Sequence, residues 1–117
     1  MATRPIVSPN SPCSRSSVAP YCERVRAQVT PERWAHVERV AILAETIARA
    51  NDFPEDEVRA TALAAVLHDA ARDLSDERLL ALAPPANATE RDHPITLHGR
   101  AARALAASWG VTDERVL

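Results

Sequence analysis

Two adjacent residues, His68 and Asp69, are the part of this sequence best suited to chemistry. They follow the apolar run Thr61–Leu67, and a buried carboxylate is costly unless it is paired or binds a metal. A third group, His36, stands four residues before Val40 in another apolar pattern, so we expect it to face inward. Imidazole and carboxylate are ordinary ligands of transition metals, so the three side chains could meet at one cation. The alternative is a core histidine that hydrogen-bonds the aspartate, and spacing alone does not decide between the two.

Helices are expected to position these groups. Thr30, Pro31 and Glu32 supply an N-cap, a proline at the first helical position and an early acid, so a long helix is predicted to begin at Pro31. Its apolar residues form two adjoining stripes, the wide face typical of a helix packed on other helices. The stripes are Val37, Ala41, Ala44 and Ala48 on one side, and Val40, Leu43 and Ile47 on the other.

The other elements follow from start and stop signals. A helical pattern begins at Tyr21, and a further helix is predicted from Pro54 to about Arg72. A short capped helix should end at Leu82, before a proline-rich loop. The next helix opens at Pro94 and ends at Gly110, which suits a left-handed C-cap. Residues 112–117 should begin one more helix, so we expect the natural chain to continue beyond this sequence.

Composition predicts an all-α domain. The chain has 117 residues, which suits one domain. It contains 23 alanines, four aromatic residues and two glycines, a composition that favours helix over sheet. Residues 1–19 are rich in serine and proline, so we expect a disordered leader there and one folded domain over residues 20–117.

Charge and apolar runs exclude several classes of partner. The net charge of −2 gives no electrostatic reason to expect nucleic-acid binding. No apolar stretch approaches the roughly 20 residues that a membrane span needs, and no signal peptide is evident. Cys13 and Cys22 do not form a recognisable disulfide framework, so a reducing cytoplasm is the expected location.

Three segments in order resemble a known family. Arg33–His36, Leu67–Asp73 and His93–Gly99 are similar to the motifs of the HD-domain metal-dependent phosphohydrolases, over about residues 21–117. More narrowly they resemble the YqeK type, the symmetrical bis(5′-nucleosyl)-tetraphosphatases, which split diadenosine tetraphosphate into two ADP with bound iron. The resemblance implies a helical bundle of the HD type, a nucleotide as small-molecule substrate, and iron as the metal, with manganese as the alternative.

The resemblance also implies a metal site. His36, His68 and Asp69 match the family's metal ligands, and Asp69 could bridge two ions. His98 matches a position that contacts a second metal or the substrate phosphate. A cation in such a site lowers the pKa of water towards neutrality, so that hydroxide attacks phosphorus at pH 7.

Two arginines are implied to bind phosphate. Arg72 stands where the family usually has lysine, one turn past His68, and is expected to act in catalysis as a phosphate clamp. Arg33, three residues before His36, resembles a residue that meets the nucleotide's phosphate. The alternative for each is a solvated arginine on a helix surface.

One departure from the family limits the expected activity. Family members continue with a helix that bears another histidine and then an aspartate that completes the metal site, and neither is present in this sequence. We therefore expect weak metal binding, and slow turnover or none, unless a partner supplies the missing ligands. The other functions to consider are hydrolysis of a different nucleotide phosphate, and a non-catalytic HD module that binds a nucleotide or a protein.

Overall fold

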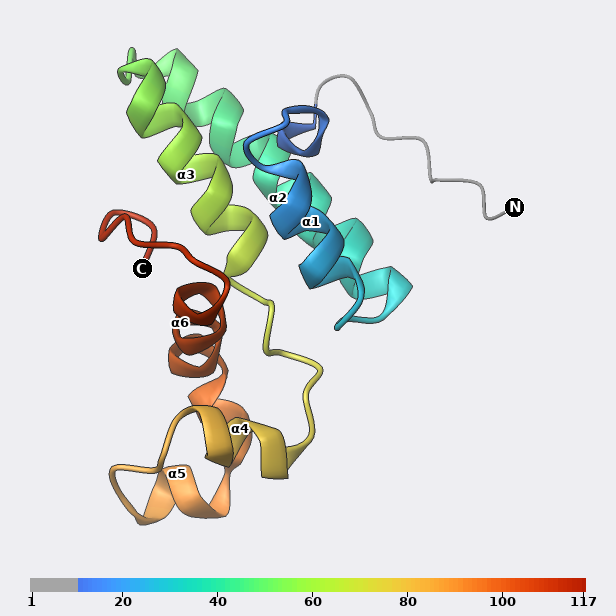
Figure 1. Ribbon diagram of the computed structural model, residues 1–117, viewed down its shortest axis with the longest axis vertical. Coiled ribbons are helices and arrows are strands. Elements are labelled where there is room, and N and C mark those ends of the chain that lie inside the picture. The colour runs from blue at the N-terminus through green and yellow to red at the C-terminus, as the bar shows by residue number, and fades with distance from the viewer. Residues whose placement is uncertain (1–10) are drawn as a thin grey trace.

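The computed structural model describes residues 11–117, and within them the chain is all-α, as predicted. Six α-helices and two short 3-10 helices occur in this range, without any strand (Figure 1). Their bounds are η1 Pro12–Ser14, α1 Ala19–Arg26, α2 Pro31–Ala50, α3 Glu55–Leu67, α4 Asp76–Leu82, α5 Ala88–Asp92, η2 Pro94–Leu97 and α6 His98–Ser108.

Two groups of helices build the molecule. Helices α1, α2 and α3 pack together, and α2 and α3 share the most extensive contact between elements (Figure 1). Helices α4 and α5, the turn η2 and helix α6 form the second group, joined to the first by an irregular segment over residues 68–75. One apolar core runs through both groups, with Val25, Val66, Leu79 and Leu105 as members from α1, α3, α4 and α6.

Capping signals placed several helix starts correctly. The Thr30 hydroxyl accepts a hydrogen bond from the Arg33 amide at 3.1 Å, so α2 begins at Pro31 as predicted. The Ser75 hydroxyl caps α4 in the same way, from the Arg78 amide at 3.3 Å. Gly110 has a φ of 96°, which confirms the left-handed C-cap after α6.

Other boundaries differ from the prediction. Helix α3 ends at Leu67, and the chain then turns over residues 68–74, where a helix to about Arg72 was predicted. The helix predicted from Pro94 begins as the 3-10 turn η2 before α6. Helix α5 was not predicted; the Asn87 side chain caps it by accepting from the Glu90 amide at 2.9 Å. Residues 114–116 form a turn where a new helix was expected.

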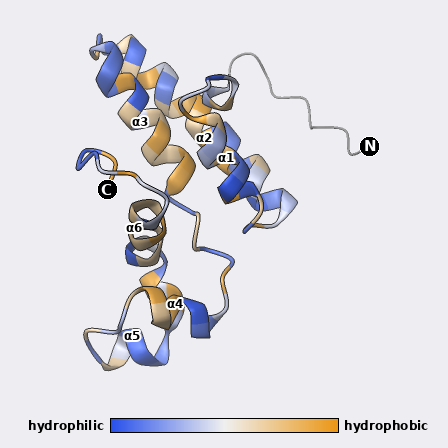
Figure 2. Ribbon diagram, in the orientation of Figure 1, coloured by the Kyte–Doolittle hydropathy of each residue, from blue (hydrophilic) through white to orange (hydrophobic). Residues whose placement is uncertain are grey.

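Only one of the two apolar stripes of α2 is buried. Val37, Ala41 and Ala48 lie in the interior. Leu43 and Ile47 are 58% and 53% exposed, so the expectation that the second stripe packs on other helices is wrong. Figure 2 shows where apolar residues gather, including the end of α3 that meets the linking segment. Val40, at the start of the second stripe, is half-buried, so the exposed part of that stripe is Leu43 and Ile47.

The structure of residues 11–19 differs from the predicted disordered leader. Residues 1–10 of the expected disordered leader lie outside the described residues, but residues 11–19 are packed, with Cys13 and Val18 in the core. Arg15 of this segment forms an ion pair with the buried Glu45 of α2. These apolar and charged contacts with the helices order a segment whose composition alone suggested disorder.

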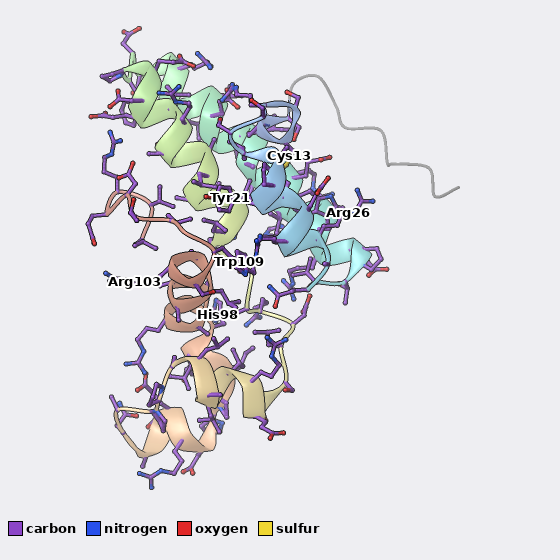
Figure 3. All side chains as sticks on the ribbon, viewed as in Figure 1. Cys13, Tyr21, Arg26, His98, Arg103 and Trp109 are labelled. Carbon is purple, nitrogen blue, oxygen red and sulfur yellow. A yellow bond between two sulfur atoms is a disulfide. The ribbon has the colours of Figure 1, made fainter. Side chains whose placement is uncertain are left out.

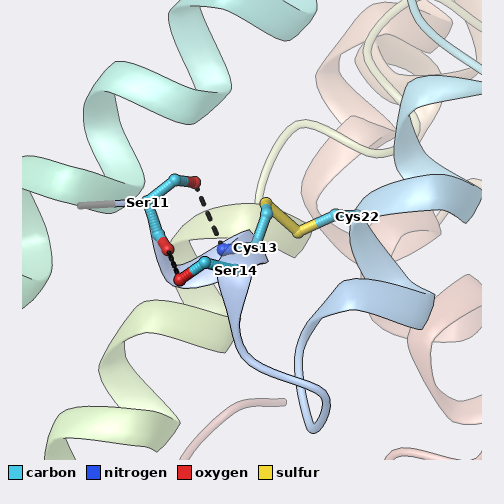
Figure 4. Close-up of a disulfide and its surroundings, with 4 residues drawn as sticks. All are labelled: Ser11, Cys13, Ser14 and Cys22. Atoms are coloured by element: carbon cyan, nitrogen blue, oxygen red, sulfur yellow. Dashed lines mark hydrogen bonds between the residues drawn. A yellow bond between two sulfur atoms is a disulfide. The ribbon is translucent and has the colours of Figure 1, made fainter. Parts of the chain in front are cut away.

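Cys13 and Cys22 form a disulfide, contrary to the sequence-based expectation (Figure 4). The turn η1 brings Cys13 back onto α1, with the two Cα atoms 6.0 Å apart. The Ser11 hydroxyl accepts from the Cys13 amide at 3.2 Å and stabilises this turn. The pairing removes the cysteine argument for a reducing cytoplasm. None of the helices in residues 11–117 combines the length and the apolar character needed to cross a membrane.

Candidate metal centre

His36, His68 and Asp69 come together in space and could hold a metal ion, and we call them the metal triad. His36 belongs to α2, whereas His68 and Asp69 directly follow the last residue of α3. One ligand atom from each side chain lies within 4.8 Å of the other two. The His36 Nε2 and His68 Nε2 atoms are 3.8 Å and 3.3 Å from Asp69 Oδ2. The contact between α2 and α3 therefore brings the three groups to one point.

Local hydrogen bonding prepares His68 to bind a cation. Its Nδ1 atom contacts the Ala65 carbonyl oxygen, one turn back along α3. Because a carbonyl can only accept, Nδ1 carries the proton and the lone pair of Nε2 stays available, the usual arrangement for a metal-binding histidine. The same Nε2 atom is the one that faces Asp69.

The triad combines an internal carboxylate with accessible imidazoles. Asp69 is only 8% exposed, whereas the side chains of His36 and His68 are 47% and 40% exposed. His36 therefore does not lie inside the core, as its spacing from Val40 suggested; it lies at the edge, over Asp69. A substrate can reach such a site from solvent, while the carboxylate stays anchored in the protein.

An ionic contact links the start of α2 to the turn after α3. The Arg33 guanidinium lies 4.0 Å from Asp69 Oδ2 and 3.4 Å from Asp73 Oδ1. The other oxygen of Asp73 accepts a hydrogen bond from the Thr30 amide at 3.1 Å. Asp73 thus holds the N-terminal end of α2 against the segment that follows α3. Helix α2 carries His36, and that segment carries Asp69. Sequence reasoning gave Asp73 no role, although it closes one of the motif segments.

Arg72 follows the triad in the same turn, and His98 belongs to another element. Arg72 is half-buried in the turn after Asp69, and its side chain makes no ion pair with any carboxylate of residues 11–117. His98 is half-buried at the first position of α6 (Figure 3), and its Nδ1 contacts the Ile95 carbonyl at 2.9 Å, which leaves Nε2 available. It does not join the cluster of metal-binding groups found in the described residues. Its contact with a second metal or a phosphate stays a prediction.

The donor set fits a divalent transition metal. Two imidazole nitrogens and one carboxylate oxygen suit iron, manganese and zinc, and the present separations are close to those of ligands held about 2.0 to 2.2 Å from one ion. Three protein ligands leave coordination positions open, which is typical of catalytic sites and not of structural ones. The same three residues are therefore suited to catalysis at a bound cation.

Comparison with known proteins gives one match. The family model of the HD domain matches residues 33–116, which include the whole triad, Arg33, Arg72 and His98. No curated protein and no solved structure matches the chain significantly.

Proposed function

Since this chain belongs to the HD-domain family, whose members are in general metal-dependent phosphohydrolases, we propose that it hydrolyses nucleotide phosphates at its metal triad. The triad itself supports this function best, because its three donor atoms lie within 4.8 Å of one another. Diadenosine tetraphosphate is the substrate we propose, on the resemblance of the three motif segments to the YqeK type. Iron is the proposed metal, with manganese as the alternative.

The reaction needs an activated water and a clamped phosphate. A bound divalent cation would activate the water and polarise a phosphoryl oxygen. Water adds to one of the two central phosphorus atoms, the bond to their bridging oxygen breaks, and this oxygen leaves with the second ADP. The partly exposed His36 and His68 hold the site open to solvent, while the buried Asp69 fixes its position.

The two arginines are expected to share the binding of substrate phosphates unequally. The charge of Arg33 is already balanced by Asp69 and Asp73. Arg72 has no carboxylate partner among residues 11–117, so its guanidinium is free to form paired hydrogen bonds with a phosphate. We therefore assign Arg72 the direct phosphate contact and Arg33 the orientation of Asp69.

The test is release of ADP from diadenosine tetraphosphate by the purified chain with added iron(II) or manganese(II). His68→Ala removes a triad member, whereas His93→Ala changes an exposed histidine outside the triad and serves as the matched control. We expect metal-dependent ADP release that His68→Ala abolishes and His93→Ala preserves. Binding of diadenosine tetraphosphate that is insensitive to a chelator, without ADP release, would overturn the hydrolase and indicate a non-catalytic module.

A further inference from the structure

A cavity of about 270 Å³ adjoins the metal triad and shares His68 with it. It lies between α3 and α6, and the C-terminal residues Val116 and Leu117 form part of its wall. Its other apolar walls come from Ala64 and Leu67 of α3 and from the small residues Gly99, Ala102 and Ala106 of α6. A group in this cavity would lie beside the reacting phosphate of a bound substrate.

Gly99 shows that the space is open. A Cβ atom added at this position would meet no atom within 4 Å, apart from the glycine's own neighbours in the helix. Close packing of helices, which often explains a glycine within a helix, therefore does not explain this one. The absence of a side chain enlarges the cavity.

The lining restricts what the cavity can hold. Its volume lies just below the range of about 300 to 1,000 Å³ typical of ligand sites, so one ring system fits and a lipid chain does not. His68 and Arg103 are the only lining residues with polar side chains, too few to satisfy the hydroxyl groups of a sugar. Apolar walls of alanine, glycine and leucine suit an apolar planar ring, and the guanidinium of Arg103 in the lining can meet the phosphate attached to it.

We propose that this cavity binds the base of the nucleotide whose phosphates lie at the triad, and that Arg103 contacts its phosphate. The proposal rests on the proposed function and names the part of the substrate that the chain recognises. Arg103 of α6 lines the cavity, and its side chain (Figure 3) is 58% exposed, with only a 3.5 Å contact to the exposed Glu114. That contact is weak enough for a phosphate to replace it.

Ion pairs hold the outer wall in place. Arg115 hydrogen-bonds Asp56 at the start of α3 at 3.0 Å and Asp113 at 2.8 Å. These contacts fix the C-terminal segment across α3, so that Val116 and Leu117 can close the cavity next to Ala64.

The test compares two probes in the absence of metal: AMP, and ribose 5-phosphate, which lacks the base. Isothermal titration calorimetry gives the two dissociation constants without any turnover, so the result does not depend on hydrolysis. Gly99→Leu adds a side chain at the cavity wall, where a Cβ atom has open space, and Ala107→Leu places the same side chain on an exposed position of α6 as the matched control. Far-UV circular dichroism confirms that both variants are helical.

We expect AMP to bind at least tenfold more tightly than ribose 5-phosphate. Gly99→Leu should weaken AMP at least tenfold and leave ribose 5-phosphate unchanged, while Ala107→Leu changes neither. Arg103→Gln should weaken the binding of AMP but not the binding of adenosine, a third probe, which lacks the phosphate. Equal binding of AMP and ribose 5-phosphate, or AMP binding that Gly99→Leu leaves unchanged, would overturn the base site. A chain that binds AMP as expected but releases no ADP from diadenosine tetraphosphate would retain the base site and lose the proposed hydrolysis.

Discussion

Removing the disulfide should destabilise the whole domain. The bond joins Cys13 of η1 to Cys22 of α1, which are nine residues apart. Closing a loop of that length in the unfolded chain lowers its entropy enough to stabilise the native state by about 2.5 kcal/mol. Because η1 and α1 contribute to the common core, the loss should appear in global unfolding and not as local fraying. A loss of this size should lower the melting temperature by roughly 10 to 20 °C.

Urea denaturation followed by circular dichroism measures this effect. The wild-type chain is compared with and without a reductant, beside the double variant Cys13→Ala and Cys22→Ala. We expect the reductant to lower the wild-type free energy of unfolding by about 2.5 kcal/mol and to leave the double variant unchanged. Two free thiols in the denatured, unreduced chain would refute the reasoning, as would a wild-type shift below about 0.5 kcal/mol, the size of ordinary surface effects.

Three further predictions concern the triad, the core and the C-terminal anchor. Manganese(II) at about 100 times its dissociation constant should raise the free energy of unfolding by about 2.7 kcal/mol, and Asp69→Asn should remove this gain in a thermal melt. Leu79→Ala should lower the free energy of unfolding in urea by about 2 to 5 kcal/mol, because Leu79 is fully buried. Leu43→Ala, on the exposed face of α2, should lower it by less than about 0.5 kcal/mol. The Arg115 guanidinium, through its hydrogen bond, holds the pKa of the Asp56 carboxyl below its usual value, so this pair stabilises the fold above the unfolded-state pKa of the carboxyl. This stabilisation is lost as pH falls through the lowered pKa of Asp56 in the folded state. The urea midpoint should therefore fall less on acidification in Arg115→Gln than in the wild type.

Each of these predictions has a result that contradicts it. A metal-induced rise in melting temperature that persists in Asp69→Asn would place the metal elsewhere. Equal costs for the two leucine variants would mean that α4 does not pack as described. An unchanged acid response in Arg115→Gln would show that its ion pair with α3 does not form in solution.

The meeting of His36, His68 and Asp69 could be predicted from sequence, whereas the choice between a metal site and a hydrogen-bonded core histidine came from the family resemblance and not from spacing. His68 and Asp69 are adjacent at the end of an apolar helix, and His36 belongs to a helix with a clear cap. The sequence did not predict that Asp73 links the start of α2 to the turn after α3. Its contacts with Arg33 and the Thr30 amide join positions about 40 residues apart. Such contacts depend on how α2 packs against the turn after α3, and helical periodicity carries no information about that packing.

The wrong predictions about the fold have related physical causes. Periodicity identifies an apolar face but not the neighbour that covers it, so Leu43 and Ile47 were expected to be buried. Composition suggested disorder for residues 11–19, because it takes no account of contacts made by single residues such as Arg15 with Glu45. The disulfide was missed for a similar reason, because Cys13 meets Cys22 of α1 only through the turn η1, which the sequence did not predict.

The order of the ligands along the chain has a consequence for biosynthesis. All three triad residues belong to α2 and the turn after α3, and a chain emerges from the ribosome with its N-terminal part first. The ligand set is therefore complete once α2, α3 and the next turn have emerged, whereas the cavity beside it needs α6 and residues 116 and 117. If both proposals hold, the nascent chain has its three candidate ligands in place before the proposed base site can form.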